Sequence, residues 1–139
     1  MKFNIAIDGP SAAGKSTIAK KLAKELGYAH LDTGAMYRCV AYFSKLKDVS
    51  FDDEEKVASL IDAMQIRFDA QGNVYLNDEN VSNEIRKNEI SMLTSKISAY
   101  PAVREKLVAM QQKMAEHKGY IMDGRDIGTV VLPNAEIKV

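Results

Sequence analysis

The chain has 139 residues, the usual length of one domain, with 46% hydrophobic and 27% charged residues. Its formal net charge is zero, so no broad field of one sign favours nucleic acid or an anionic membrane surface. No hydrophobic run approaches the roughly 20 residues that cross a bilayer. The single cysteine, Cys39, excludes an internal disulfide and fits the reducing cytoplasm. We expect a cytoplasmic protein with no nucleic-acid or membrane partner.

Strand and helix signals alternate along the chain. Short apolar runs predict strands, and apolar residues three or four apart predict helices that bury one face. The predicted elements are a strand at 3–8, a helix that ends at Gly27, a strand at 28–31, helices at 34–46, 52–64, 88–100 and from Pro101 onward, and strands at 119–124 and 135–139. The apolar run at 3–8 is too short for the core of a signal peptide. This alternation predicts an α/β fold with a mostly parallel sheet covered by helices.

Two of these helices have a clear apolar face. In the first, isoleucine and leucine recur every four residues from Ile18 through Leu22 to Leu26, with two alanines beside this stripe. In the helix at 34–46, Met36 and Val40 share one face. We expect these faces to pack in the core.

The stretch 65–82 differs from its surroundings, because apolar and polar residues alternate around Gly72-Asn73. This pattern is typical of a β-hairpin. We therefore expect one domain with three parts, a first core part at 1–62, a small antiparallel β insert at 63–87 and a second core part at 88–139. A covered parallel sheet does not normally end on a strand without its helix, so we expect a C-terminally incomplete domain.

The segment GPSAAGKS fits the phosphate-loop pattern G-x-x-x-x-G-K-[ST], after a predicted strand and before a predicted helix. Its glycines let backbone N–H groups point at a phosphate, and the helix start adds its positive end. Lys15 would reach the β- and γ-phosphates, and the Ser16 hydroxyl would ligate Mg²⁺. The predicted nucleotide-binding residues are Gly9, Pro10, Ser11, Ala12, Ala13, Gly14, Lys15, Ser16 and Thr17. The motif alone fits an ATPase, a GTPase switch or a small-molecule kinase.

The stretch LDTGAMYR follows the second predicted strand. The hydroxyls of Thr33 and Tyr37 and the guanidinium of Arg38 are donors suited to a second phosphate. The same stretch also fits a helix N-cap at Asp32 or Thr33 with a surface arginine one turn later. These residues alone do not separate the two interpretations.

The stretch YIMDGRDIGT carries three charged residues at the end of a predicted strand. Asp123 stands where a carboxylate of P-loop enzymes faces Mg²⁺ through water or orders the site. Arg125 and Asp126 follow at the sheet edge where ligands bind in open α/β folds, and the alternative is a surface ion pair in a tight turn. His30 and His117 lack sequence partners for a catalytic triad or a metal site, so we interpret both as structural.

Four stretches together, AIDGPSAAGKST, LDTGAMYR, PAVREKL and MDGRDIGTVV, resemble the bacterial cytidylate kinases. The resemblance implies a P-loop nucleoside monophosphate kinase core with a monophosphate-binding insert, and transfer of the ATP γ-phosphate to CMP or dCMP with Mg²⁺. It implies three catalytic residues, Lys15, Asp123 and Arg125. It also implies substrate contacts from Thr33, Tyr37, Arg38, Ser95, Arg104, Asp123, Arg125 and Asp126.

Within that resemblance, Arg38 and Arg125 would hold the CMP phosphate, helped by Thr33 and Tyr37. Ser95, Arg104 and Asp126 would meet the cytosine, as its chemistry allows. A carboxylate accepts from the exocyclic amine and an arginine donates to the ring acceptors, whereas uracil reverses this pattern.

Two other functions stay open from the sequence. One is another P-loop monophosphate or small-molecule kinase, and the other is a nucleotide-binding fragment without turnover, because members of the family continue with a lid and closing elements. A GTPase switch fits poorly, since the guanine-reading pattern N-K-x-D does not occur in the sequence. We expect a monomer that acts on small-molecule substrates.

Overall fold

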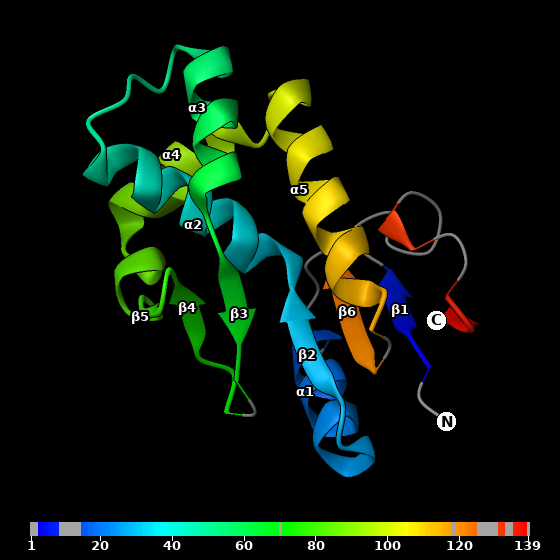
Figure 1. The fold of residues 1–139 in the computed structure, drawn as a ribbon. Helices are drawn as coiled ribbons and strands as arrows, with labels where there is room; N and C mark the ends of the chain where they lie inside the picture. Colours follow the sequence, from blue (N-terminus) through cyan, green and yellow to red (C-terminus); the bar gives the residue numbers. More distant parts are fainter. Residues whose placement is uncertain are drawn as a thin grey trace. The chain divides into compact units, whose positions relative to one another are not determined.

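A computed structural model describes residues 3–8, 15–69, 71–117, 119–124, 131–132 and 135–138, without the side chains of Lys15 and Ser16. Figure 1 shows the elements along the chain and labels the five α-helices and the strands β1 to β6. They are β1 (Ile5–Asp8), α1 (Lys15–Leu26), β2 (Ala29–Asp32), α2 (Thr33–Leu46), α3 (Glu54–Leu60), η1 (Ile61–Ala63), β3 (Ile66–Phe68), β4 (Val74–Leu76), β5 (Glu79–Asn80), η2 (Glu84–Arg86), α4 (Asn88–Ile97), α5 (Pro101–Ala115), β6 (Tyr120–Gly124) and β7 (Ile137–Lys138).

The chain divides into two compact units. The first comprises residues 1–33, 68–72 and 108–139, and the second comprises residues 34–67 and 73–107. Within the described residues, no helix is both long and apolar enough to cross a membrane.

The first unit is built on a four-stranded sheet in the order β2-β6-β1-β7. All three strand pairs are parallel, and their register sets Ile7 beside Asp123 and Asp32 beside Asp123. Neighbouring parallel strands end at the same edge of a sheet. The carboxyl ends of β1, β2 and β6 therefore meet at one edge, and the predicted parallel sheet is confirmed.

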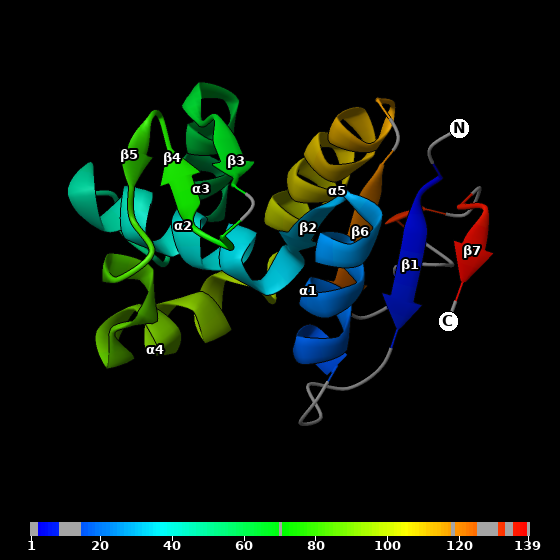
Figure 2. The same cartoon turned by 90° about the horizontal axis from the view of Figure 1, so that it is seen from below.

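Helices cover both faces of this sheet. On one face Ile5, Ile7 and Ile121 pack with residues of α1, in a cluster that also takes in Leu22 and Tyr28. The other face presents Asn4, whose Nδ2 donates to the backbone oxygen of Ala115 at the end of α5, at 2.9 Å. Figure 2 shows α1 and the C-terminal part of α5 on opposite sides of the strands.

The face by which α1 packs differs from the predicted stripe. Ala19 and Ala23 are buried, whereas Ile18 is 62% exposed and Leu26 is 48% exposed. Alanines one turn apart let the helix backbone approach the sheet closely, and a helix presents only one face to it. The prediction that Ile18 and Leu26 share the packed face was wrong.

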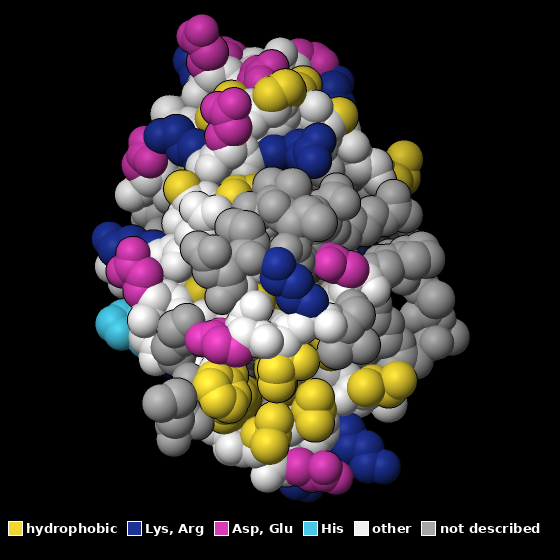
Figure 3. All heavy atoms as spheres, turned by 90° about the vertical axis from the view of Figure 1, so that its right-hand side faces the viewer, with side chains coloured by type: hydrophobic (Ala, Val, Ile, Leu, Met, Phe, Trp, Pro, Cys, Tyr) yellow, Lys and Arg dark blue, Asp and Glu magenta, His cyan; other side chains and the backbone are white. Residues whose placement is uncertain are grey.

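Hydrophobic side chains also reach the surface elsewhere in the first unit. Phe3, just before β1, and Ile137, on the edge strand β7, are both exposed. Figure 3 shows hydrophobic side chains gathered toward the lower end of the face that it views. Such a gathering differs from the single exposed hydrophobic residues that are ordinary on a protein surface.

The second unit contains the helices α2, α3 and α4, the first half of α5 and most of the small sheet. Met36 and Val40 of α2 are buried, as predicted, and so are Ile97 of α4 and Leu107 of α5. Hydrophobic residues at helical spacing give each helix one apolar stripe.

The small sheet has the order β3-β4-β5, and β4 and β5 are antiparallel. The turn between them is formed by Asn77 and Asp78, both with positive φ, at 48° and 70°. Two-residue hairpin loops need this backbone conformation, which asparagine and aspartate tolerate. The predicted antiparallel sheet is confirmed, and its third strand was not anticipated.

Candidate active site

The carboxyl end of β6 carries a buried hydrogen bond between a histidine and an aspartate. The Nε2 of His30 lies 2.6 Å from the Oδ1 of Asp123, and the two side chains are only 8% and 4% exposed. A carboxylate only accepts hydrogen bonds, so Nε2–H donates to Oδ1. The hydroxyl of Thr33 donates to the backbone oxygen of Asp123 at 3.0 Å. Asp123 and Thr33, both predicted site residues, therefore meet here, together with His30, which the sequence indicates only as a structural residue.

The predicted phosphate loop connects two elements that meet this edge. β1 ends at Asp8 and α1 begins at Lys15, so the loop leads from a strand end to a helix N-terminus, the usual site of a bound phosphate. Loop residues 9–14 lie outside the described residues, as do Arg125 and Asp126. Thr17, in the first turn of α1, is exposed.

The second unit holds Arg38 in a fixed position. Its Nη1 donates to the backbone oxygen of Ile85 at 3.0 Å and to the hydroxyl of Ser91 at 2.7 Å. A guanidinium has five N–H donors in a planar fork, and Nη1 carries two of them. These two bonds therefore orient the fork without using the donors on Nη2 and Nε.

Ser95 lies one helical turn after Ser91, on α4. Its hydroxyl donates to the backbone oxygen of Ser91 at 3.2 Å, and the side chain is exposed. Residues four apart lie on the same side of a helix. Two predicted substrate residues, Arg38 and Ser95, are thus both connected to Ser91.

Tyr37 and Arg104 are also brought together in the second unit. Burial raises the pKa of the Tyr37 hydroxyl, and the positive charge and hydrogen bond of Arg104 partly offset that rise. Burial disfavours a charged phenolate, whereas a nearby cation favours it. The structure therefore associates Tyr37 with Arg104, which is predicted to meet the base. The resemblance had assigned Tyr37 to the phosphate of CMP.

This contact predicts the titration of Tyr37. In the wild-type protein the phenol should ionise above its ordinary pKa, and Arg104→Met should raise the pKa further because the favourable charge is lost. The pKa of the Tyr37 hydroxyl is higher in the folded protein than in the unfolded chain. Its contribution to the stability of the folded protein is therefore present below pH 10 and is lost as the pH rises further. The difference in ultraviolet absorbance between wild-type protein and Tyr37→Phe, followed against pH, isolates this group. An unchanged or lower pKa in Arg104→Met would contradict the contact.

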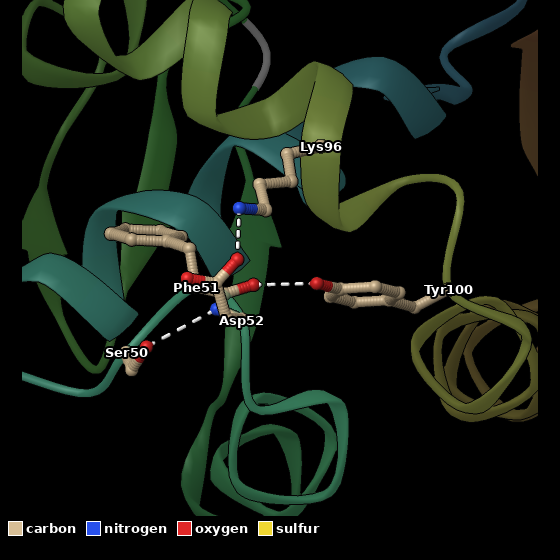
Figure 4. A network of polar contacts seen from close by, with 5 residues as sticks. All are labelled: Ser50, Phe51, Asp52, Lys96 and Tyr100. Atoms are coloured by element: carbon tan, nitrogen blue, oxygen red, sulfur yellow. Dashed lines mark hydrogen bonds and ion pairs between the residues drawn. The ribbon is translucent and has the colours of Figure 1, made fainter.

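The turn between α4 and α5 is held by the segment that precedes α3, as Figure 4 shows. Lys96 forms an ion pair with Asp52, and the hydroxyl of Tyr100 donates to the backbone oxygen of Phe51 at 2.7 Å. The hydrogen bond from Lys96 to Asp52 raises the pKa of the lysine. Ser95 and Arg104 lie on either side of this turn. These contacts therefore help to fix the backbone positions of both residues.

The family profile named cytidylate kinase matches residues 5–139, which include the site residues described above. The chain belongs to the cytidylate kinase family. Similar curated proteins, each named cytidylate kinase, come from Caldicellulosiruptor bescii (51% identical), Listeria welshimeri (49%) and Streptococcus gordonii (48%). Each alignment covers 99% of this chain.

The chain spans 62–63% of the length of these three relatives. The cytidylate kinase match includes the phosphate loop, the LDTGAMYR stretch and the DGRD stretch, because all three lie within residues 5–139. The signal that could have found His30 is its place between the apolar residues Ala29 and Leu31 of β2. A polar ring there needs a partner, and the neighbouring strand supplies Asp123.

Proposed function

We propose that the complete gene product transfers the γ-phosphate of ATP to CMP or dCMP and forms CDP or dCDP. The observation that carries this proposal is membership of the cytidylate kinase family over nearly the whole chain. The arrangement of the described residues supports it, because donors suited to a phosphate and to a base lie on α2, α4 and α5.

Phosphoryl transfer needs positioning and charge neutralisation more than covalent chemistry. In the proposed reaction the phosphate loop and Lys15 hold the β- and γ-phosphates of ATP. Arg38 and Arg125 hold the phosphate of CMP, so that its oxygen faces the γ-phosphorus. Asp123 lies beside the transferring group, and Thr33 fixes its backbone by the 3.0 Å hydrogen bond.

The proposed donor nucleotide carries Mg²⁺, which neutralises charge on its phosphates. Mg²⁺ prefers oxygen ligands and usually takes one or two from the protein. Among the residues that the structure describes, no group of three or more histidine, cysteine, aspartate or glutamate side chains is placed to hold a metal. The proposed ion would be held mainly by phosphates and water, with the Ser16 hydroxyl as its protein ligand.

The same proposal extends to the setting of the enzyme. All residues assigned to the two nucleotides come from one chain, so a monomer suffices. Cys39 is buried and is not part of a disulfide, which fits a cytoplasmic location.

The decisive test is a reaction of the complete gene product with ATP, Mg²⁺ and a panel of acceptors, with products separated by chromatography. CDP and dCDP should form from CMP and dCMP much faster than the diphosphates of AMP, GMP or UMP form. Preference for another monophosphate or for a small molecule that is not a nucleotide would replace the proposed substrate. ATP hydrolysis without any phosphorylated acceptor would contradict the kinase assignment.

The base preference predicts a specific effect of Asp126→Asn. The new amide keeps the size of the side chain but presents an NH₂ donor where the carboxylate would accept from the cytosine amine. A buried mismatch of this kind costs about 1 kcal/mol or more, so the ratio of CMP to UMP use should fall at least about fivefold. Competition between CMP and UMP at fixed ATP measures this ratio. An unchanged ratio, or equal weakening of CMP and ATP, would show that Asp126 does not contact the base.

A further inference from the structure

The contact between His30 and Asp123 joins residues that are 93 apart in the sequence. The register of β2 and β6 pairs His30 with Ile121, two residues before Asp123. Side chains of paired residues in a parallel sheet point to the same face, and so do side chains two apart along one strand. The imidazole and the carboxylate therefore share the face on which Ile121 packs with α1.

The surroundings of Asp123 make a donor necessary. Its side chain is 4% exposed, and a buried carboxylate without hydrogen bonds is strongly unfavourable. At 2.6 Å, the bond from His30 has the short length that a charged acceptor gives. Thr33 holds the backbone of the same residue at 3.0 Å. Asp123 is thus fixed by its side chain and by its main chain.

We propose that His30 is a positioning residue for phosphoryl transfer, because its hydrogen bond holds the Asp123 carboxylate in one orientation at the carboxyl end of β6. This role rests on the proposed function, in which Asp123 lies beside the transferring phosphoryl group. His30 touches neither nucleotide and acts only through Asp123. An apolar side chain of similar size would fill the same space and remove this hydrogen bond.

Two substitutions separate the hydrogen bond from packing. His30→Leu fills the site without a donor, whereas His30→Gln can place an amide N–H near the position of Nε2. In the complete gene product, His30→Leu should lower kcat for CMP phosphorylation by about 10- to 100-fold, with the KM values for ATP and CMP changed less than about threefold. His30→Gln should recover most of this loss.

A matched control comes from the same strand. Leu31 is fully buried, and its side chain points to the opposite face of the sheet. Leu31→Val should lower the melting temperature without lowering kcat more than about threefold. If Leu31→Val lowers kcat as much as His30→Leu does, the role of His30 is only structural and the proposal fails.

A double-mutant cycle tests whether His30 acts through Asp123. Asp123→Asn should lower kcat, and adding His30→Leu to it should cause less than about threefold further loss, because the group being positioned has already changed. Independent, multiplicative losses would overturn the proposal, as would a His30→Leu protein with wild-type kcat. Failure of the wild-type protein to form CDP would instead overturn the proposed function and this role with it.

Discussion

Lys15→Ala is expected to lower kcat/KM for phosphoryl transfer by about 100- to 1,000-fold or more. Lys15 is the lysine of the phosphate loop and is the first residue of α1. Its charge would offset negative charge on the β- and γ-phosphates as they separate, and loss of one such preorganised group typically has this effect. Alanine is a better helix former than lysine, so the melting temperature should scarcely change.

The control for Lys15→Ala is Lys21→Ala, which removes an exposed lysine from the same helix. It should leave the rate within about twofold of wild type, because a solvated side chain away from the phosphates contributes little. A coupled spectrophotometric assay with ATP and CMP measures the rates, and thermal unfolding measures stability. Lys15→Ala activity within about tenfold of wild type, with an unchanged melting temperature, would contradict the phosphate-loop assignment.

The elements of this fold were predictable where the spacing of the apolar residues and the length of the segment indicate the same kind of element. The parallel strands and the buried face of α2, with Met36 and Val40, follow directly from spacing. The packed face of α1 did not follow, because Ile18 and Leu26 outweigh alanine on any hydrophobicity scale. Close approach to a sheet favours small side chains, and Ala19 and Ala23 provide them.

The third strand of the small sheet was missed for a different reason. β5 has only two residues, both exposed, and so lacks an apolar pattern. Its position depends on the turn at Asn77 and Asp78, where two polar residues take left-handed conformations. An Asn-Asp pair after an apolar strand is a usable signal for such a turn.

The candidate site was predictable as a set of motifs and not as a set of contacts. Spacing identifies the phosphate loop, but no spacing indicates that His30 meets Asp123 or that Arg38 meets Ser91. Those contacts depend on strand order and on the packing of α2 against α4. They matter for function because they decide the orientation of the groups that the motifs supply.

The contact of Arg38 with Ser91 leads to the second large expected effect. Arg38→Ala should lower kcat/KM for CMP by about 10- to 150-fold and leave the KM for ATP nearly unchanged. In the proposed reaction the lost contact is a charge-assisted hydrogen bond to the CMP phosphate, which would contribute about 1.5–3 kcal/mol. Arg86→Ala, which removes an exposed arginine of η2, is the matched control and should behave like wild type.

Two further variants show whether the orientation of the guanidinium matters. Arg38→Lys keeps the charge but loses the planar fork, so it should recover only part of the loss. Ser91→Ala keeps the arginine but removes the 2.7 Å acceptor that orients Nη1, and should raise the KM for CMP about threefold. Steady-state kinetics with each nucleotide varied in turn measures both effects. If Arg38→Ala weakens ATP and CMP equally, or if Ser91→Ala changes only stability, Arg38 serves the fold of the second unit and does not bind the acceptor phosphate.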